Sequence, residues 1–430
     1  MRTGLLGGML LLGACAEARV DANGTTDARD GNGDGGRDDG GMELDASLGL
    51  TGWHPLGAPI GSSTNNLIPA VAIDGTGLPI VAIVAGTDTS SFGIEVHRAV
   101  NNAWTLVGPR IPTGTMTVPA IAATGSTYHV AWPAGSSRQV RTWNGASWSA
   151  PAGTPVGSYT TFLGHVSLAL DAASQLWVAY NEHSAAQTAE RVFVNANQGT
   201  SWPLRGMTSY TNALHETASP NQSALAPDLA AGAGAMFVAW QGNGVHVRQW
   251  NPGTTAWDAV GTGAIVPPPA AGVVSASTSA IGVDSAGRPT VIYHAYKGGL
   301  DGTLVFVARH DGASWIHIGQ SLQAYAGGAN GMATYATAQD IAVTAASDAY
   351  IAFTEEDATG ESAVHVWRCA STGGCAPVGR GRLDADVGDA STARLALDGG
   401  GRPVVVWSEL DAAGNSHVHV WRYFGDPDAP

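Results

Sequence analysis

Charged side chains are scarce in this 430-residue chain, in which Asp, Glu, Lys and Arg together make up 13% of the sequence, about half the usual share. Positive charge is the scarcer kind, because 20 Lys and Arg stand against 35 Asp and Glu and the formal net charge is -15. Such a chain has no basic surface with which to neutralise phosphates. Nucleic acid is therefore not expected as a partner.

Common catalytic and metal-binding motifs are also lacking. The sequence contains no HExxH, no Walker loop and no Gly-x-Ser-x-Gly. We therefore expect no cofactor and no metal, and the sequence alone nominates no catalytic residue. What it has in excess is glycine (58 residues) and tryptophan (14 residues), a bias towards turns and aromatic strands that favours an all-β protein.

The N-terminus has the pattern of an export signal, with Arg2 followed by the short apolar run "LLGGMLLLGAC". Its end, "LGAC", resembles the lipobox of bacterial lipoproteins, which implies a signal peptide over residues 1–14 and a lipid on Cys15. The protein is then attached to the membrane through Cys15. Ala16, which stands where a retention signal would place Asp, suggests the outer membrane; an ordinary signal peptide is the alternative.

Residues 15–50 are rich in Gly and Asp, and they have too few apolar side chains to offset the entropy of ordering. We interpret them as a disordered tether. Asp30, Asn32, Asp34 and Gly35 match the first half of a calcium loop, but position 12 is Gly41 instead of Glu, so the pattern does not establish calcium binding.

A repeat fills residues 51–424. Its first element is a small-residue apolar strand that recurs seven times, as PAVAID (69–74), PAIAAT (119–124), VSLALD (166–171), PDLAAG (227–232), SAIGVD (279–284), QDIAVT (339–344) and ARLALD (393–398). A tight turn, a second strand ending in an aromatic residue, an alternating third strand and a Trp-Gly fourth strand follow. Seven four-stranded antiparallel units predict a seven-bladed β-propeller; a tandem of separate domains is the alternative.

One position of the first strand is always small, as expected where seven innermost strands crowd round an axis: Ala72, Ala122, Ala169, Ala230, Gly282, Ala342 and Ala396. The seventh unit lacks a fourth strand, whereas residues 51–60 (TGWHPLGAPI) have the character of one. We therefore expect residues 51–60 to pair near Val420, complete the last blade and close the ring, so that no sheet edge stays open. Residues 425–430 form a short tail, and we expect a monomer.

Two cysteines and three histidines have structural interpretations. Cys369 and Cys375 flank a five-residue turn of an exported chain, which predicts a disulfide. His246, His365 and His419 occupy the same third-strand position in different units, so we expect them to pack between blades rather than to bind a metal.

Polar residues gather where the second strands end, on the loop face of the expected propeller, and one long loop between units adds three more. We interpret this acidic, partly aromatic set as a ligand-binding face. The residues are Glu182, His183, Tyr210, His215, Glu216, His294, Tyr296, Glu355, Glu356 and Glu409.

The strand, turn and Trp-Gly pattern resembles the sialidase-like and BNR-type repeat propellers of exported bacterial proteins. "PRIP" (109–112) is similar to the Arg-Ile-Pro signature of sialidases, and "NQGTSW" to their Asp-box, with Asn197 in place of Asp. The resemblance implies arginines that bind a carboxylate, for which Arg110, Arg205 and Arg380 are the candidates. No Tyr and Glu pair marks a nucleophile, so the catalytic residues of sialidases are not matched.

These observations lead to three hypotheses. The first is a non-catalytic cell-envelope lipoprotein whose propeller binds a carbohydrate or a protein on its loop face. The second is a glycan-active enzyme, a hydrolase or a lyase, in which Glu355, Glu356 and Glu409 from neighbouring units supply two carboxylates. The third is a scaffold of an outer-membrane assembly.

Overall fold

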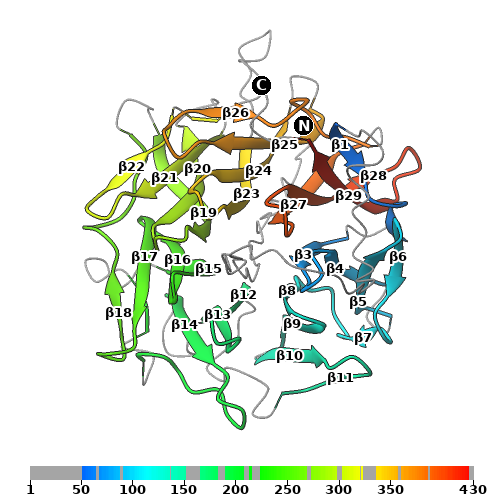
Figure 1. Ribbon diagram of the computed structural model, residues 1–430, viewed down its shortest axis with the longest axis horizontal. Helices are drawn as coiled ribbons and strands as arrows, with labels where there is room; N and C mark the ends of the chain where they lie inside the picture. The colour runs from blue at the N-terminus through cyan, green and yellow to red at the C-terminus, as the bar shows by residue number, and fades with distance from the viewer. Residues whose placement is uncertain are drawn as a thin grey trace, which may run out of the picture.

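Seven antiparallel sheets stand round a central channel in the computed structural model, as Figure 1 shows. The structure describes residues 51–425 except 64–66, 88–90, 136, 152–164, 183–188, 208–212, 216–222, 269–272, 298–302, 320, 323–335, 357–359 and 386–387. The predicted all-β, seven-bladed β-propeller is confirmed. Cys15, the expected signal peptide and tether, and residues 426–430 of the expected tail lie outside the described residues.

Each blade is a meander that runs from the channel outwards. The innermost strands are the seven small-residue segments of the repeat. They are β3 (Pro69–Ile73), β8 (Ala120–Thr124), β12 (Val166–Leu170), β15 (Leu225–Gly232), β19 (Val273–Val283), β23 (Ala336–Val343) and β27 (Ala390–Leu397).

The second strands are β4 (Pro79–Ala85), β9 (Thr127–Ala134), β13 (Leu176–Glu182), β16 (Ala235–Gly242), β20 (Pro289–Lys297), β24 (Ala349–Glu356) and β28 (Pro403–Leu410). The third strands are β5 (Gly93–Val100), β10 (Ser137–Trp143), β14 (Arg191–Ala196), β17 (Gly244–Asn251), β21 (Thr303–His310), β25 (Ser362–Cys369) and β29 (Ser416–Phe424).

The outer strands are short: β6 (Ala103–Leu106), β11 (Trp148–Ser149), β18 (Ala256–Ala259), β22 (Trp315–His317), β26 (Cys375–Pro377) and β1 (Gly52–Pro55). In the third blade the outer strand is reduced, within the described residues, to a bridge between Asn195 and Leu204. Two further short strands, β2 (Ile60–Ser63) and β7 (Ile111–Pro112), pair with β29 and β5.

The ring closes as the sequence predicts. Strand β1 pairs with β29, with Trp53 opposite Tyr423 and Pro55 opposite Trp421, and Leu56 N–H donates to Val420 O at 2.8 Å. Strand β2 continues the closure, with Ile60 opposite Val418. The two ends of the repeat thus share one sheet, which removes two open edges.

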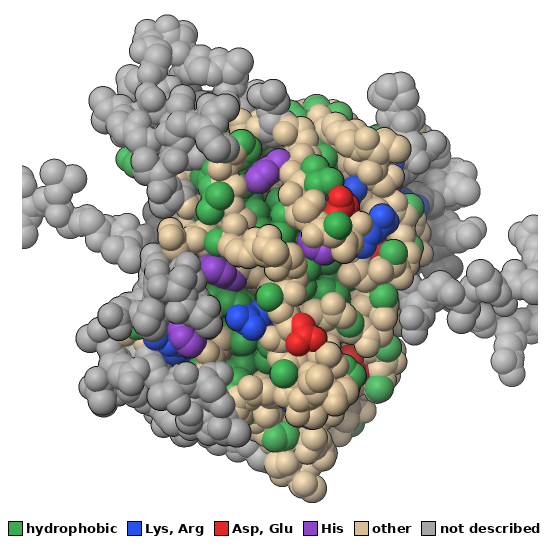
Figure 2. Space-filling view, turned by 90° about the vertical axis from the view of Figure 1, so that its left-hand side faces the viewer, with side chains coloured by type: hydrophobic (Ala, Val, Ile, Leu, Met, Phe, Trp, Pro, Cys, Tyr) green, Lys and Arg blue, Asp and Glu red, His purple; other side chains and the backbone are tan. Residues whose placement is uncertain are grey.

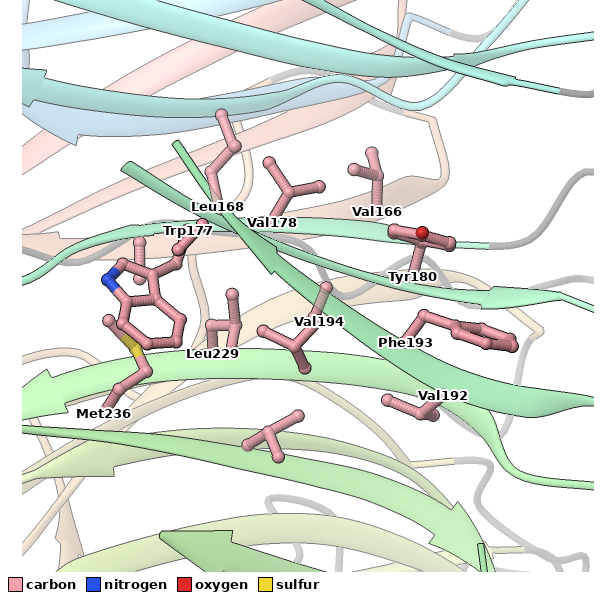
Figure 3. Packing of buried hydrophobic residues seen from close by; sticks show 14 of the residues in the cluster. Val166, Leu168, Trp177, Val178, Tyr180, Val192, Phe193, Val194, Leu229 and Met236 are labelled. Atoms are coloured by element: carbon pink, nitrogen blue, oxygen red, sulfur yellow. The ribbon is translucent and has the colours of Figure 1, made fainter. Parts of the chain in front are cut away.

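Crowding at the axis explains the small residue of each inner strand. A Cβ added to Gly282 would lie 2.5 Å from Cγ2 of Val343 on the inner strand of the next blade. Contact this close excludes larger side chains. Hydrophobic clusters join neighbouring blades, and Figure 3 shows part of one of them, where Leu168 and Trp177 of the third blade pack toward Leu229 and Met236 of the fourth.

The predicted disulfide between Cys369 and Cys375 is present and links β25 to β26. His246, His365 and His419 stack on Trp240, Phe353 and Trp407, their cross-strand neighbours in the same sheet. These stacking contacts lie within a blade, whereas the sequence predicted packing between blades. On the flank shown in Figure 2, charged side chains are few and scattered.

Candidate functional site

The second strands end on one face of the ring, and three glutamates occupy the same place in three blades, two residues beyond the strand's aromatic residue. They are Glu182 (1% exposed), Glu355 (0%) and Glu409 (1%). The sequence predicts these residues to face a ligand. The structure places all three carboxyl groups inside the protein, so contact with a ligand would require the surrounding side chains to move.

Glu182 forms an ion pair with Arg138, the second residue of β10 in the preceding blade. Nη2 of Arg138 also donates to Asn181 O at 2.6 Å, and its guanidinium lies 4.6 Å from the centre of the Tyr180 ring. Both partners of the pair are buried, and desolvation lowers the pKa of Arg138 although Glu182 opposes it. This pair connects the second and third blades.

Glu409 has structural contacts as well. Its Oε2 accepts hydrogen bonds from Trp407 Nε1 at 2.7 Å and from Ala385 N–H at 3.1 Å. Glu356, one residue beyond Glu355, is half-buried at the end of β24, opposite Ser362. Glu409, which the sequence proposes as one member of a catalytic pair of carboxylates, thus holds the loop that connects the sixth and seventh blades.

The remaining predicted residues are dispersed. His294 is half-buried on β20, where burial lowers its pKa to about 4, and Tyr296 is 42% exposed at the end of the same strand. His215 is half-buried, and its Nδ1 lies 2.8 Å from Ala213 O. His183, Tyr210 and Glu216 lie outside the described residues.

A residue that the sequence did not single out, His165, lies at the channel end of the same face. It precedes β12, and its backbone N–H donates to Oδ1 of Asn181 at 2.9 Å. The residue is half-buried, and Nδ1 has no hydrogen-bond partner within the described part of the chain. Burial, with a smaller contribution from the positive charge of Arg394, lowers the pKa of His165 to about 4.

Arg394 belongs to β27 of the seventh blade, whereas His165 belongs to the third. Figure 1 shows β12 and β27 on opposite sides of the central channel. Arg394 is 1% exposed, and its Nη1 donates to Ala393 O at 2.9 Å. Residues far apart in the sequence are thus brought into electrostatic contact at the channel. We call His165, Asn181, Arg138, Glu182 and Arg394 the channel cluster.

Aligning the seven repeats shows that Arg394 stands at an inner-strand position where other blades have alanine, and this comparison could have identified it from the sequence. The residue two places before the small one of each inner strand is Ala70, Ala120, Ser167, Asp228, Ala280, Asp340 and Arg394. Four blades thus place a polar side chain at a position that is alanine in the others. Such a change inside a crowded, apolar position requires compensating contacts.

The two aspartates at this position have such contacts. Oδ2 of Asp228 accepts the N–H of Ile281 at 2.9 Å, and Oδ2 of Asp340 accepts that of Leu395 at 2.7 Å. Each carboxylate therefore binds the inner strand of the next blade. β-Bulges immediately precede Asp228, Asp340 and Arg394, which re-aims these side chains relative to a regular strand.

The arginines implied by the sialidase resemblance do not converge. Arg110 binds Glu95 in the first blade, with Nε 2.8 Å from Oε1. Arg205 lies over Trp177 and Trp250, and Arg380 lies over Trp421. The three arginines belong to the first, third and sixth blades, and each lies next to an outer strand, far from the axis. They therefore cannot bind one carboxylate together.

Among the described residues, no three His, Cys, Asp or Glu side chains form a group suited to a metal ion. The same part of the chain contains no helix with the length and hydrophobicity needed to cross a membrane.

Comparison with known proteins identifies the fold through structure alone. No family model and no curated protein matches the sequence. A polysaccharide lyase described as a PL25 ulvan lyase is similar with a TM-score of 0.56 at 12% identity, over 85% of this chain and 95% of that chain. The same lyase bound to -[GlcA(1-4)Rha3S]- is similar with a TM-score of 0.52 at 11% identity, over 86% and 94%. A Trypanosoma rangeli sialidase matches 84% of this chain and 55% of its own, at 10% identity and a TM-score of 0.41.

These matches correct the leading expectation from the sequence. That expectation, a non-catalytic binding lipoprotein, rested on the absence of a local catalytic motif. The two matches with TM-scores of 0.56 and 0.52 are described as polysaccharide lyases, which favours the glycan-active alternative. Absence of a local motif carries little weight in a propeller, because residues from different blades can influence one site, as the effect of the Arg394 charge on the pKa of His165 illustrates.

Proposed function

We propose that this protein is a glycan-active enzyme, a polysaccharide lyase that acts on uronate-containing chains at the channel end of the loop face. The observation that carries the proposal is His165, an uncharged, half-buried imidazole in the electrostatic field of Arg394. The structural similarity to a lyase bound to a glucuronate-containing disaccharide supports it.

Of the two glycan chemistries left open by the sequence, hydrolysis has the weaker support. Two carboxyl groups about 5 to 10 Å apart across a cleft are needed for it. Glu182, Glu355 and Glu409 are fully buried, and Glu182 and Glu409 are bound to Arg138 and to Trp407. These carboxylates stabilise the ring and are not free to attack or protonate a sugar.

Elimination needs a base rather than a carboxylate pair. It breaks the C5–H and C4–O4 bonds of a 4-linked uronate, forms the C4–C5 double bond and transfers the proton to O4 of the departing sugar. A neutral imidazole takes the proton from C5 and, as an imidazolium, returns it to O4. His165 is kept neutral at physiological pH because its pKa lies near 4.

Substrate charge would improve His165 as a base. Desolvation and Arg394 keep the pKa of His165 low in the free protein. A uronate carboxylate near the imidazole favours its protonated form, so substrate binding raises that pKa towards neutral pH. The base thus gains strength when the substrate arrives, which suits an acidic glycan better than a neutral one.

The location expected from the sequence forms part of the proposal. An exported enzyme that carries a lipid on Cys15 would meet polysaccharides in the cell envelope or outside it. Metabolic labelling with a fatty acid, compared between the natural chain and C15A, tests this part separately from the chemistry.

The enzyme test uses the whole chain without its signal peptide and a panel of uronate-containing polysaccharides, including ulvan. We expect a rise in the ultraviolet absorbance of the new double bond, and at least a hundredfold loss of kcat in H165N. The control is H129N, because His129 also has a pKa lowered to about 4 by burial but lies at the opposite end of its second strand. New reducing ends without the double bond would favour hydrolysis, and an unchanged rate in H165N would refute the assignment of His165.

A further inference from the structure

A cleft of about 410 Å³ lies at the seam where the ring closes, between β2 of the last blade and the first blade. Six of its lining residues are polar: Ser62, Ser63, Thr87, Ser91, Glu95 and Arg110. Its lining comes from β2, the segment before β3, the end of β4, the loop after it, β5, and Arg110 just before β7. None of these residues belongs to the channel cluster, and β5 and β7 lie at the outer side of the first blade in Figure 1. The cleft is therefore separate from the channel cluster.

Arg110 enters this cleft because Gly93 leaves room for it. A Cβ on Gly93 would lie 2.6 Å from Cγ and Cδ of Arg110, so the arginine side chain crosses β5 only where that position is glycine. Nε of Arg110 donates to Oε1 of Glu95 at 2.8 Å, Nη2 donates to the same oxygen, and Nη1 donates to Ser91 O at 2.9 Å. Sequence and geometry together hold the guanidinium in one orientation.

This arrangement leaves donors for a ligand. A guanidinium has five N–H groups, and three of those of Arg110 are used by Glu95 and Ser91. The two that remain belong to the terminal nitrogens. The Arg110 side chain is 40% exposed and lines the cleft, and these two N–H groups have no hydrogen-bond partner in the described part of the chain.

The negative charge of Glu95 beside Arg110 determines whether the cleft favours an anionic or a neutral ligand. The hydrogen bond from His97 and the nearby Arg110 guanidinium lower the pKa of Glu95 to about 2, so it stays ionised and its charge balances that of Arg110. A carboxylate or sulfate ligand would lie beside this carboxylate and be repelled. A sugar hydroxyl, in contrast, accepts from Arg110 and donates to Glu95, and the exposed hydroxyls of Ser62 and Thr87 offer further hydrogen bonds.

We propose that this cleft is a second carbohydrate site, distinct from the channel, that binds neutral sugar residues of a polysaccharide. Its volume lies within the range of small-molecule sites, about 300 to 1,000 Å³, which corresponds to roughly one or two sugar rings. A second site on the same propeller raises the local concentration of a long glycan at the channel. The proposal requires no catalysis and stands independently of the lyase chemistry.

Calorimetric titration of the whole chain with neutral hexasaccharides of glucose, xylose and rhamnose, and with hexagalacturonate, tests the proposal. At least one neutral probe binds the unaltered protein and H165N equally. R110Q removes the guanidinium N–H groups that would donate to the sugar. S62W places a large side chain in the cleft from an exposed position. Both variants should weaken that binding at least tenfold. R380Q, which removes an exposed arginine from over Trp421 of the seventh blade, leaves it unchanged.

Three results would overturn the proposal. They are the absence of binding by every neutral probe, unchanged affinity in S62W with a melting temperature equal to that of the unaltered protein, and tighter binding of hexagalacturonate that R110Q abolishes. Because Ser62 has no side-chain hydrogen bond among the described residues, S62W removes none there, and it keeps the test decisive even if R110Q proves unstable.

Discussion

The indole Nε1 of Trp53 donates a 2.8 Å hydrogen bond to the backbone carbonyl of Val378, which lies 325 residues later in the chain and in the preceding blade. The residue after Val378 is Gly379, and Trp53 lies directly over it. Three other blades repeat this contact with the preceding blade: Trp148 to Val107, Trp257 to Arg205, and Trp315 to Val260. Each acceptor precedes a glycine, so the recurring Trp-Gly pattern records a contact between neighbouring blades.

Loss of the Trp53 contact should open the ring. W53A removes a side chain that is 8% exposed, which we expect to destabilise the protein by about 3 to 5 kcal/mol, and W53F, which loses the hydrogen bond, by about 1 to 2 kcal/mol. W104F is the control, because Nε1 of Trp104 has no hydrogen-bond partner in the described part of the chain. Urea unfolding measures the three changes; equal costs for W53F and W104F would contradict the role of the bond.

Gly261 and Gly263 separate two reasons for glycine within one turn. Both have positive φ, +74° and +76°, but a Cβ on Gly261 would lie 2.8 Å from Cδ1 of Trp315, whereas one on Gly263 meets nothing within 4 Å. We expect G263A to cost about 1 kcal/mol through its backbone alone, and G261A to cost about 2 to 3 kcal/mol because the tryptophan is also displaced. Thermal unfolding of the two variants gives the comparison, and equal melting temperatures would refute the packing role.

Removing one partner of the buried Arg138–Glu182 pair should lower the free energy of unfolding strongly, whereas replacing both partners with apolar side chains should lower it little. R138M removes the Arg138 cation from beside the buried Glu182 carboxylate, which we expect to cost about 3 to 5 kcal/mol. The double variant R138M/E182L should recover most of this loss. The control R382M removes a half-buried, solvent-accessible partner of Asp384 and should cost less than about 1 kcal/mol. Denaturant titration of all four proteins checks the order.

Stability should decrease in mild acid before the carboxyl groups titrate. Burial lowers the pKa of His129, His165, His294 and His365 to about 4, below the ordinary value of 6.5. Between pH 6.5 and 4 the unfolded chain binds more protons at these residues than the folded chain, so unfolding becomes more favourable as the pH falls. H365F keeps a ring against Phe353 and removes one titrating group, so its melting temperature should decrease less between pH 7.5 and 4.5 than that of the unaltered protein. An identical pH dependence would contradict this origin.

The sequence by itself determined the blade count, the closure of the ring by residues 51–60 and the Cys369–Cys375 disulfide. These features follow from local periodicity: a small residue where inner strands crowd, an Asp or Gly turn, and a Trp-Gly pair in successive units. Because the same physical requirement recurs from blade to blade, the residue that meets it recurs as well. The seven units of one chain can therefore be compared with one another.

Only the tertiary structure shows which side chains lie near the channel and which are buried between blades. It buried Glu182, Glu355 and Glu409, which sequence reasoning had placed on a ligand-binding surface, and it brought His165 close enough for the charge of Arg394 to lower its pKa. Strand periodicity specifies which side chains share a face of a sheet, but it does not specify which blades face each other across the axis or which carboxylates find a buried partner. Those relationships depend on the curvature and closure of the whole ring, to which every blade contributes.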